Sequence, residues 1–448
     1  MATRRAVRAA VAAVVVVLLT TVSGGTPTVA APTAQSDGVA AVIASYQTRI
    51  PELMAQKQIP GLALALVDGD GVVWQQGFGS LDSDGGTPVT VDTIFSVQSM
   101  SKACTATAVM RAVQSGLLDL DVPITTYLPD FTVHSAFESH PERKITLRML
   151  LSHTAGFTHE APLGNSYEPG PGDFDAHVRS ISDTWLRFPV GTGYAYSNLG
   201  IDLAGYILEQ VSNKPFPVVM RDSLLAPLGM DHSTFDRARV HATAGRAVGH
   251  TGDLVRPRVD CPMMAAGGLW ATATDLAKFL EFQLGDGTVD GRTVLDAALM
   301  QEMRTVPAPH AGAPAGYALG VARMHWLAGR DPDLFNHNGG GDGFLSDLWW
   351  LPQLQLGIAV LTNSDNHDLQ MSLALGILRD LSPSRAAGTT TACSACRPSP
   401  MSWSPTATTS HRRTWPPGSR PSRCRRPASS PPAGPGTTSC IAPGRWAR

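Results

Sequence analysis

A serine and a lysine stand three residues apart, as Ser99 and Lys102, in the stretch Phe-Ser-Val-Gln-Ser-Met-Ser-Lys over 95–102. The segment 102–114 lacks Pro and Gly and repeats apolar residues at helical spacing, which predicts a helix. Residues three apart share a helix face, so the amine is expected beside the hydroxyl. A lysine whose pKa is lowered can take the serine proton, and the pair therefore predicts an acyl-transfer nucleophile. Alone, the pattern is also typical of a helix start with a solvated lysine.

Two downstream tripeptides, singled out by their resemblance to motifs of a known serine-hydrolase family, contain side chains that could join this chemistry: Tyr-Ser-Asn at 196–198 and His-Asn-Gly at 337–339. A tyrosinate beside a lysine is plausible, because cationic neighbours favour the phenolate. Structural alternatives exist for both, since Tyr196 could fill the core and His337 could pair with Asp342. His153, near the end of a helix predicted over 145–157, is favoured as a capping or core residue.

The N-terminus predicts export. Three arginines between positions 4 and 8 precede an apolar run over 9–19, and small and polar residues follow through Ala34. This is the three-part pattern of a secretory signal peptide, and the run is shorter than the roughly 20 residues that span a bilayer. Residues 1–34 are therefore expected to be removed, leaving a secreted, extracytoplasmic protein without a stable membrane anchor.

Sheet-forming sequence lies at both ends of the body, 35–383, and helical sequence lies between them. Segments 62–67 and 72–79 flank an Asp-Gly-Asp-Gly turn and predict a hairpin. Later segments predict three strands and a last helix: 316–325, 346–351, 356–362 and 369–381. One domain of this kind has an antiparallel sheet packed against helices, with the site in the cleft beside the insert.

Charge is unevenly distributed along the 448 residues, whose formal net charge is -2. Ten of the 35 basic residues are arginines after Pro383, where no lysine or acid occurs, so the body holds 25 basic against 37 acidic residues. The near-neutral sum predicts no nucleic-acid partner.

The tail over 384–448 is rich in Arg, Pro, Ser and Thr and has no hydrophobic periodicity, so it is expected to be disordered. Its Cys-Ser-Ala-Cys at 393–396 has no matching ligand pair, and no metal site is predicted. One hypothesis is that the tail is an out-of-frame translation. The alternative is a genuine basic linker or cell-wall-associating tail.

Five segments together resemble the serine beta-lactamase and penicillin-binding-protein superfamily, in the branch of class C beta-lactamases, D-alanyl-D-alanine carboxypeptidases, D-aminopeptidases and related esterases. The resemblance covers about 39–381. The segments occur in the family's order: Phe-x-x-x-Ser-Met-Ser-Lys at 95–102, Leu-Leu-Ser-His-Thr-Ala-Gly at 150–156, Tyr-Ser-Asn at 196–198, Gly-Gly-Leu-x-x-Thr-Ala-x-Asp-Leu at 267–276 and His-Asn-Gly at 337–339. The resemblance implies an α+β fold, with a beta-lactamase/transpeptidase-like antiparallel sheet flanked by helices and a mostly helical inserted subdomain.

The resemblance also implies roles for individual residues. Ser99 would attack a carbonyl and form an acyl-enzyme, while Lys102 and Tyr196 would share proton transfer. Asn198 would bind the substrate amide and hold Lys102. No cofactor or metal is implied.

The third motif is expected to border the bound substrate. His337 would contact the substrate's carboxylate or the leaving group, and the backbone N–H groups of Ser99 and Gly340 would form the oxyanion hole, next to Gly339. Class C beta-lactamases usually carry Lys-Thr-Gly here, so the histidine is more similar to the peptidase and esterase members.

These inferences predict a secreted serine hydrolase acting on D-amino-acid peptides, amides or esters, with D,D-carboxypeptidase-like activity and esterase activity as close rivals. Beta-lactamase ranks third, and a penicillin-binding sensor or pseudoenzyme without turnover is the competing class. An alpha/beta-hydrolase would need Gly-x-Ser-x-Gly and a zinc hydrolase His-Glu-x-x-His, and neither occurs. The expected partner is a small-molecule or peptide substrate, of which cell-wall peptide is one candidate. The oligomeric state stays undetermined.

Overall fold

The computed structural model describes residues 34–165, 173–256, 260–307, 315–327 and 330–382. The predicted signal peptide up to residue 33, the predicted tail over 384–448 and most of the loop 164–172 lie outside these residues. Within them, no helix is both long enough and apolar enough to cross a membrane.

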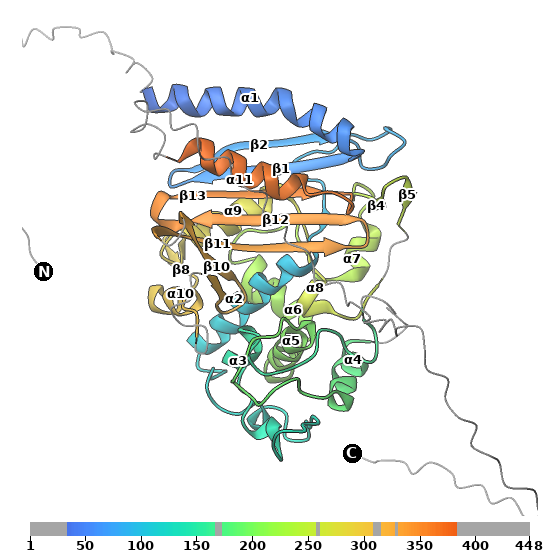
Figure 1. The fold of residues 1–448 in the computed structure, drawn as a ribbon, viewed down its shortest axis with the longest axis vertical. Helices are drawn as coiled ribbons and strands as arrows, with labels where there is room; N and C mark the ends of the chain where they lie inside the picture. Colours follow the sequence, from blue (N-terminus) through green and yellow to red (C-terminus); the bar gives the residue numbers. More distant parts are fainter. Residues whose placement is uncertain (1–33, 166–172, 257–259, 308–314, 328–329, 383–448) are drawn as a thin grey trace, which may run out of the picture. The chain divides into compact units, whose positions relative to one another are not determined.

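A seven-stranded antiparallel sheet forms the centre of the fold, in the order β2-β1-β13-β12-β11-β10-β9 (Figure 1). In chain order its strands are β1 (Gly61–Asp68), β2 (Gly71–Gly79), β9 (Ala315–Tyr317), β10 (Ala322–Leu327), β11 (Arg330–Gly341), β12 (Phe344–Leu351) and β13 (Leu356–Thr362). The first strand pairs with the last along its length, so the two ends of the body meet inside one sheet. The predicted α+β class with an antiparallel sheet is confirmed.

The strand β1 is buried along nearly all of its length because layers of side chains cover both of its faces. Its leucines at 62, 64 and 66 join the outer core, and the smaller residues at 63, 65 and 67 join the inner core. This double burial explains why the segment is a continuous apolar run rather than an alternating one.

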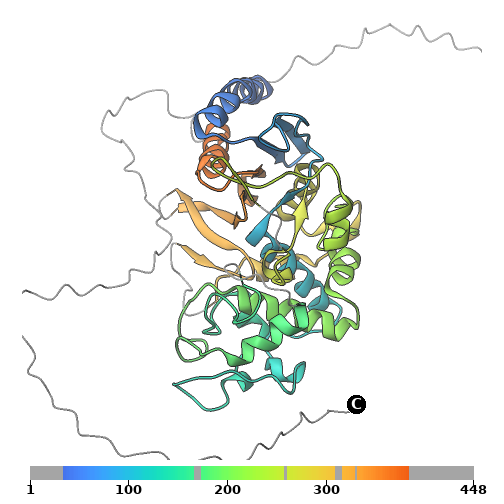
Figure 2. The same ribbon diagram turned by 90° about the vertical axis from the view of Figure 1, so that its right-hand side faces the viewer.

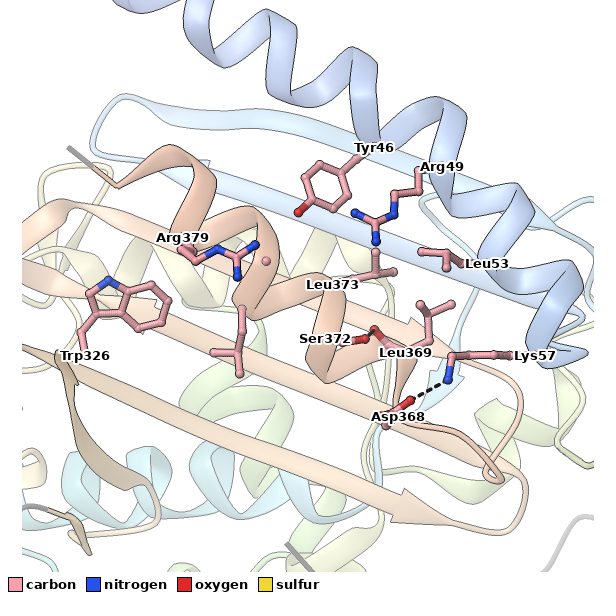
Figure 3. A pocket seen from close by; sticks show the side chains of 12 residues that line it. Tyr46, Arg49, Leu53, Lys57, Trp326, Asp368, Leu369, Ser372, Leu373 and Arg379 are labelled. Atoms are coloured by element: carbon pink, nitrogen blue, oxygen red, sulfur yellow. Dashed lines mark hydrogen bonds and ion pairs between the residues drawn. The ribbon is translucent and has the colours of Figure 1, made fainter. Parts of the chain in front are cut away.

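Two helices cover the outer face of the sheet, α1 (Ala34–Lys57) and α11 (Leu369–Leu381) (Figures 1 and 2). They contact each other and enclose an apolar cluster with the large side chains of β1, β12 and β13. A groove of about 530 Å³ lies between them, lined at its edge by Lys57 and Asp368 (Figure 3).

The inner face is covered by the mostly helical segment between β2 and β9, as predicted. Its longer helices are α2 (Ser101–Gln114), α5 (Asn198–Ser212) and α9 (Ala273–Leu284). Shorter helices complete it: α3 (Leu147–Leu151), α4 (Phe174–Ser180), α6 (Phe216–Met220), α7 (Arg237–Ala242), α8 (Met264–Gly267) and α10 (Ala297–Met303). Short strands pair as β3 (Phe95–Ser96) with β6 (Trp270–Ala271), β4 (His250–Thr251) with β5 (Leu254–Val255), and β7 (Thr288–Val289) with β8 (Arg292–Thr293).

Two predicted elements were wrong in extent. The strand predicted over 316–325 is two strands, β9 and β10, separated by a turn in which Gly320 has a φ of +78°. The helix predicted over 145–157 ends at Leu151, because His153 adopts the left-handed region with a φ of +60°. In both cases a residue with a positive φ reverses the backbone, although the apolar periodicity of the sequence continues past that residue.

Candidate active site

Ser99 lies in a 3-10 turn over Gln98–Met100, directly before α2. The preceding residue, Gln98, has a φ of +48°, a strained conformation for a residue with a Cβ. Ser101 Oγ donates to the carbonyl of Gln98 at 2.6 Å, and Gln98 Nε2 donates to Ser96 Oγ at 3.0 Å, so side chains on both sides hold the turn. The half-buried Ser99 is thus fixed at the N-terminal end of the buried helix α2.

Lys102 is fully buried, and its Nζ lies 2.9 Å from Ser99 Oγ and 2.8 Å from the carbonyl oxygen of Ala266. Burial lowers the pKa of Lys102 to about 7, against the opposing effects of Asp202 and Glu160. A large fraction of the amine is therefore the free base at neutral pH, and its lone pair can accept the Ser99 proton. The structure brings this predicted pair together.

The carbonyl that Lys102 contacts is positioned by an aspartate that the sequence prediction missed. Asp202, inside α5, accepts the backbone N–H groups of Ala265 and Ala266 at 3.0 and 2.9 Å, and it lies 3.2 Å from His177 Nε2. These bonds fix the short helix α8, so that the Ala266 carbonyl is directed at the amine. An acidic residue within the otherwise apolar stretch 199–208 of this helix was the available signal.

Tyr196 lies beside both reacting groups, with Lys102 Nζ 4.9 Å from the centre of its ring and its hydroxyl next to the Ser99 side chain. The ring is half-buried, but protein surrounds the hydroxyl, and this burial raises the pKa of Tyr196. Burial therefore favours a neutral phenol over the expected tyrosinate, because a half-neutral lysine offers little charge to offset it.

His153 packs beneath this tyrosine, with a distance of 4.5 Å between the ring centres of His153 and Tyr196. Its Nδ1 accepts the backbone N–H of Ser197 at 3.2 Å, and the side chain is 2% exposed. Burial, with a smaller effect from Lys102, holds the pKa of His153 well below its usual range. The residue fits the favoured interpretation of a core histidine. Its ring packs against the ring of Tyr196 and its Nδ1 holds the next residue, Ser197.

His337 is neutral and already has two partners. Its Nδ1 lies 2.7 Å from the carbonyl oxygen of Asn338, and its Nε2 lies 2.8 Å from the hydroxyl of Tyr317. A carbonyl only accepts, so Nδ1 carries the proton and Tyr317 donates to Nε2. Burial lowers the pKa of His337 to about 3, with a smaller effect from Lys102. The alternative pair with Asp342 is therefore not formed, and the expected contact with a substrate's carboxylate or the leaving group stays a prediction.

The glycines of the third motif bring strand β11 against the nucleophile turn. A Cβ on Gly339 would overlap the carbonyl oxygen of Val97 and stand 3.0 Å from the Ser99 nitrogen, so only glycine fits there. On the partner strand β12, Ser346 Oγ donates to the same Val97 carbonyl at 2.8 Å. Gly340 follows on the strand, and the Ser99 N–H and this segment therefore lie together, as an oxyanion hole requires.

The strand edge beside these glycines pairs with no other described strand. Among the described strands, β10 pairs with β11 only as far as Asn336, so the segment from His337 to Gly341 is paired with β12 alone. An unpaired edge of this kind can bind a peptide backbone.

Asn198 begins α5 and is 5% exposed. Its Nδ2 donates to Glu160 Oε1 at 2.9 Å, and its buried Oδ1 makes no hydrogen bond to the described residues. The expected contact between Asn198 and Lys102 is therefore replaced by one with Glu160, which the sequence prediction did not identify. The amide oxygen is left as the group that can accept from a substrate N–H.

The profile of the Beta-lactamase family matches residues 47–378, a span that contains all of these side chains. The chain belongs to the Beta-lactamase family. Its members are generally serine hydrolases, in agreement with a buried lysine beside an accessible serine. A relative described as "Penicillin-binding protein 4", from Amycolatopsis lactamdurans, is 30% identical over 338 residues, which cover 71% of this chain and 85% of the relative.

Two further comparisons agree with this assignment. "Protein Rv1367c" of Mycobacterium tuberculosis is 32% identical over 271 residues, covering 52% of this chain and 66% of the relative. The octameric penicillin-binding protein homologue from Pyrococcus abyssi superposes with a TM-score of 0.65 at 24% identity, over 75% of this chain and 77% of that chain. At this identity the structural likeness concerns the fold alone.

Proposed function

We propose that this chain is a secreted serine hydrolase that forms an acyl-enzyme at Ser99 and acts on D-amino-acid peptides, amides or esters. One observation carries the proposal: the fully buried Lys102 amine lies 2.9 Å from the Ser99 hydroxyl oxygen. With a pKa lowered to about 7, that amine is a base matched to neutral pH.

The proposed reaction begins when Lys102 takes the Ser99 proton and Ser99 Oγ bonds to the substrate's carbonyl carbon. The N–H groups of Ser99 and Gly340 stabilise the oxyanion. The bond to the leaving group then breaks, and the neutral phenol of Tyr196 passes a proton to the departing oxygen or nitrogen while the protonated lysine replaces it. Water hydrolyses the acyl-enzyme by the same steps.

The protonation state of His337 bears on the two rival substrate classes, carboxypeptidase peptides and esters. A D,D-carboxypeptidase substrate and a beta-lactam both carry a free carboxylate, and His337 is neutral with both ring nitrogens in contact with protein groups. The third motif therefore supplies no positive charge to receive an anion. This favours esters and amides without a carboxylate over the carboxypeptidase, and it places beta-lactamase lower still.

The test compares three substrates and one label on the purified protein: a chromogenic ester, a chromogenic cephalosporin and a D-Ala-D-Ala peptide, with a fluorescent penicillin as the label. We expect ester hydrolysis that is lost in Ser99→Ala and kept in Ser372→Ala, a serine on the outer helix α11. Hydrolysis that persists in Ser99→Ala would refute the nucleophile. Stable penicillin labelling without turnover of any substrate would instead favour the sensor.

A further inference from the structure

A buried histidine and a buried aspartate lie behind α8, the short helix whose carbonyl contacts Lys102. The side chains of His177, in α4, and Asp202, in α5, have no exposed surface, and His177 Nε2 lies 3.2 Å from Asp202 Oδ2. The other carboxylate oxygen accepts the N–H groups of Ala265 and Ala266. Burying one charge alone is costly, so each of these two side chains depends on the other as its counter-charge.

The partners of His177 require a proton on each ring nitrogen. Its Nδ1 lies 2.7 Å from the carbonyl oxygen of Leu163, which can only accept, and its Nε2 faces the carboxylate of Asp202. One imidazole satisfies two acceptors only in its cationic form. Burial lowers the pKa of His177, but the hydrogen bond and the charge of Asp202 oppose it, and this pKa is raised overall. The two side chains thus form a pair of opposite charges.

Helix α8 connects this pair to the base. Its two N–H groups bond Asp202, while the carbonyl of Ala266 lies 2.8 Å from Lys102 Nζ. The carbonyl of Ala265 accepts from Thr105 Oγ1 at 2.8 Å, so both carbonyls bond side chains of α2. Burial lowers the pKa of Lys102 to about 7, and the charge of Asp202 acts in the opposite direction. A cation at His177 offsets part of that charge.

The other titratable groups near the pair fall into two sets. Burial keeps five of them uncharged near neutral pH: His153, Tyr196, Tyr206, Cys261 and His337. The second set is charged. Glu160 acts on both Lys102 and His177, and it stays in place when the pair is altered. Asp175 and Arg179 bond each other on the exposed side of α4. Substitutions within the pair therefore change one charge against a constant background.

We infer that His177 and Asp202 are positioning residues for Lys102: Asp202 fixes α8 so that a carbonyl is directed at the amine, and the His177 cation balances the charge of Asp202 so that the amine can act as a base. The inference rests on the proposed function and adds the control of its base. Removing the positive charge should make the amine harder to deprotonate, and removing the negative charge should make it easier.

The pH profile of kcat/KM for ester hydrolysis tests this. His177→Gln keeps N–H donors but removes the cation, so the acid limb is expected to move up by about one pH unit. The rate should then fall about 10-fold relative to the wild type at about pH 6, and much less at about pH 9. His140→Gln, the same change in an exposed pair with Glu142, should leave the limb in place.

Asp202→Asn provides the opposite change. The amide keeps an oxygen for the N–H groups of α8, and its nitrogen can donate to a neutral His177. The acid limb is expected to move down by about half a pH unit. In this background His177→Gln should no longer shift the limb, because the histidine loses its charge together with its partner.

Nitrogen-15 NMR of the histidine-labelled wild type measures the charge on His177 without turnover. At about pH 8.5 exposed histidines are neutral, whereas His177 should still carry a proton on both ring nitrogens. Asp202→Asn should remove one of the two N–H signals. Through-space contacts to Leu163 assign these signals in the wild type, so the measurement stands even if a variant does not fold.

A His177 with a single ring proton at about pH 8.5 would overturn the inference. So would an acid limb that His177→Gln leaves in place or moves to lower pH, and so would a loss of rate that is equal at every pH. Failure of the proposed function looks different. In that case ester hydrolysis would persist in Ser99→Ala, whereas the charge on His177 is measured without substrate.

Discussion

Two lysines on opposite faces of the central sheet show how position decides chemistry. Lys57, at the end of α1 on the outer face, is 37% exposed and lies 2.7 Å from Asp368 Oδ1 in an ordinary surface ion pair (Figure 3). Lys102, on the inner face, is fully enclosed and contacts a serine and a carbonyl. Water and an acid keep an ammonium charged, whereas burial without a directly bonded acid favours the free amine.

The outer face also holds a buried ionisable group, which can be compared directly with the buried Lys102 of the inner face. Asp347 of β12 is fully buried, and burial raises its pKa to about 8. Trp349 and Gln370 lie beside the carboxyl, but neither carboxyl oxygen has hydrogen-bond geometry to a described group. On each face, burial thus shifts an ionisable side chain towards its neutral form, but of these two only Lys102 has a nucleophile in reach.

Replacing the inner lysine should have the largest effect. Lys102→Met removes the base and is expected to lower kcat/KM by about 10³-fold. Because the pKa of Lys102 is lowered in the fold, the unfolded chain binds more protons between about pH 7 and about pH 10, and stability rises with pH in that window. The variant should lose that rise, as denaturant unfolding across the window would show. Full activity in the variant would contradict the assignment of Lys102 as the base.

Tyr196→Phe should lower kcat/KM by about 10²-fold, because the phenol beside Ser99 can no longer pass a proton to the leaving group. Steady-state kinetics with two esters of different leaving-group basicity measure this. The loss should be larger for the more basic leaving group, and an equal loss for both would contradict proton donation by Tyr196.

The wild type should show an acid limb in its pH profile. Since protonation of Lys102 blocks the base and its pKa is about 7, kcat/KM is expected to fall about tenfold per pH unit below that value. Rates measured in constant-ionic-strength buffers provide the test. A profile that stays flat down to about pH 5 would mean that a different group accepts the proton.

Asp347→Asn should stabilise the protein without changing its activity. A carboxyl whose folded pKa is raised contributes its full stability below about pH 4, and that contribution is lost as pH rises towards about 8, at up to about 1.4 kcal/mol per pH unit. Asparagine has no such loss. The difference in unfolding free energy between variant and wild type should therefore grow with pH, and a difference independent of pH would contradict the buried neutral acid.

The smallest effect is expected for Lys57→Met, which makes on the outer face the same substitution as Lys102→Met on the inner face. Loss of an exposed ion pair should change the unfolding free energy by less than about 1 kcal/mol and leave kcat/KM unchanged. A large loss of activity would show that the two faces are coupled.

Much of the fold was predictable where one local pattern specified an element. The strand predicted over 356–362 and the helix over 369–381 agree with β13 and α11 at both ends, because long apolar repeats are bounded there by turn residues. The split of 316–325 was not predictable from alternation, since it depends on a left-handed Gly320. Tyr317, the partner of His337, gave no signal, because its role depends on a strand twenty residues later.

The sequence by itself determined which side chains are available: Ser99 with Lys102, Tyr196 with Asn198, and His337 before two glycines, in the order of a known family. The tertiary structure decided their states. Burial beside Ala266 lowers the pKa of Lys102, burial also lowers the pKa of His337, and Glu160 holds the amide nitrogen of Asn198. Desolvation and hydrogen bonding depend on neighbours that are distant along the chain, so spacing alone does not specify protonation.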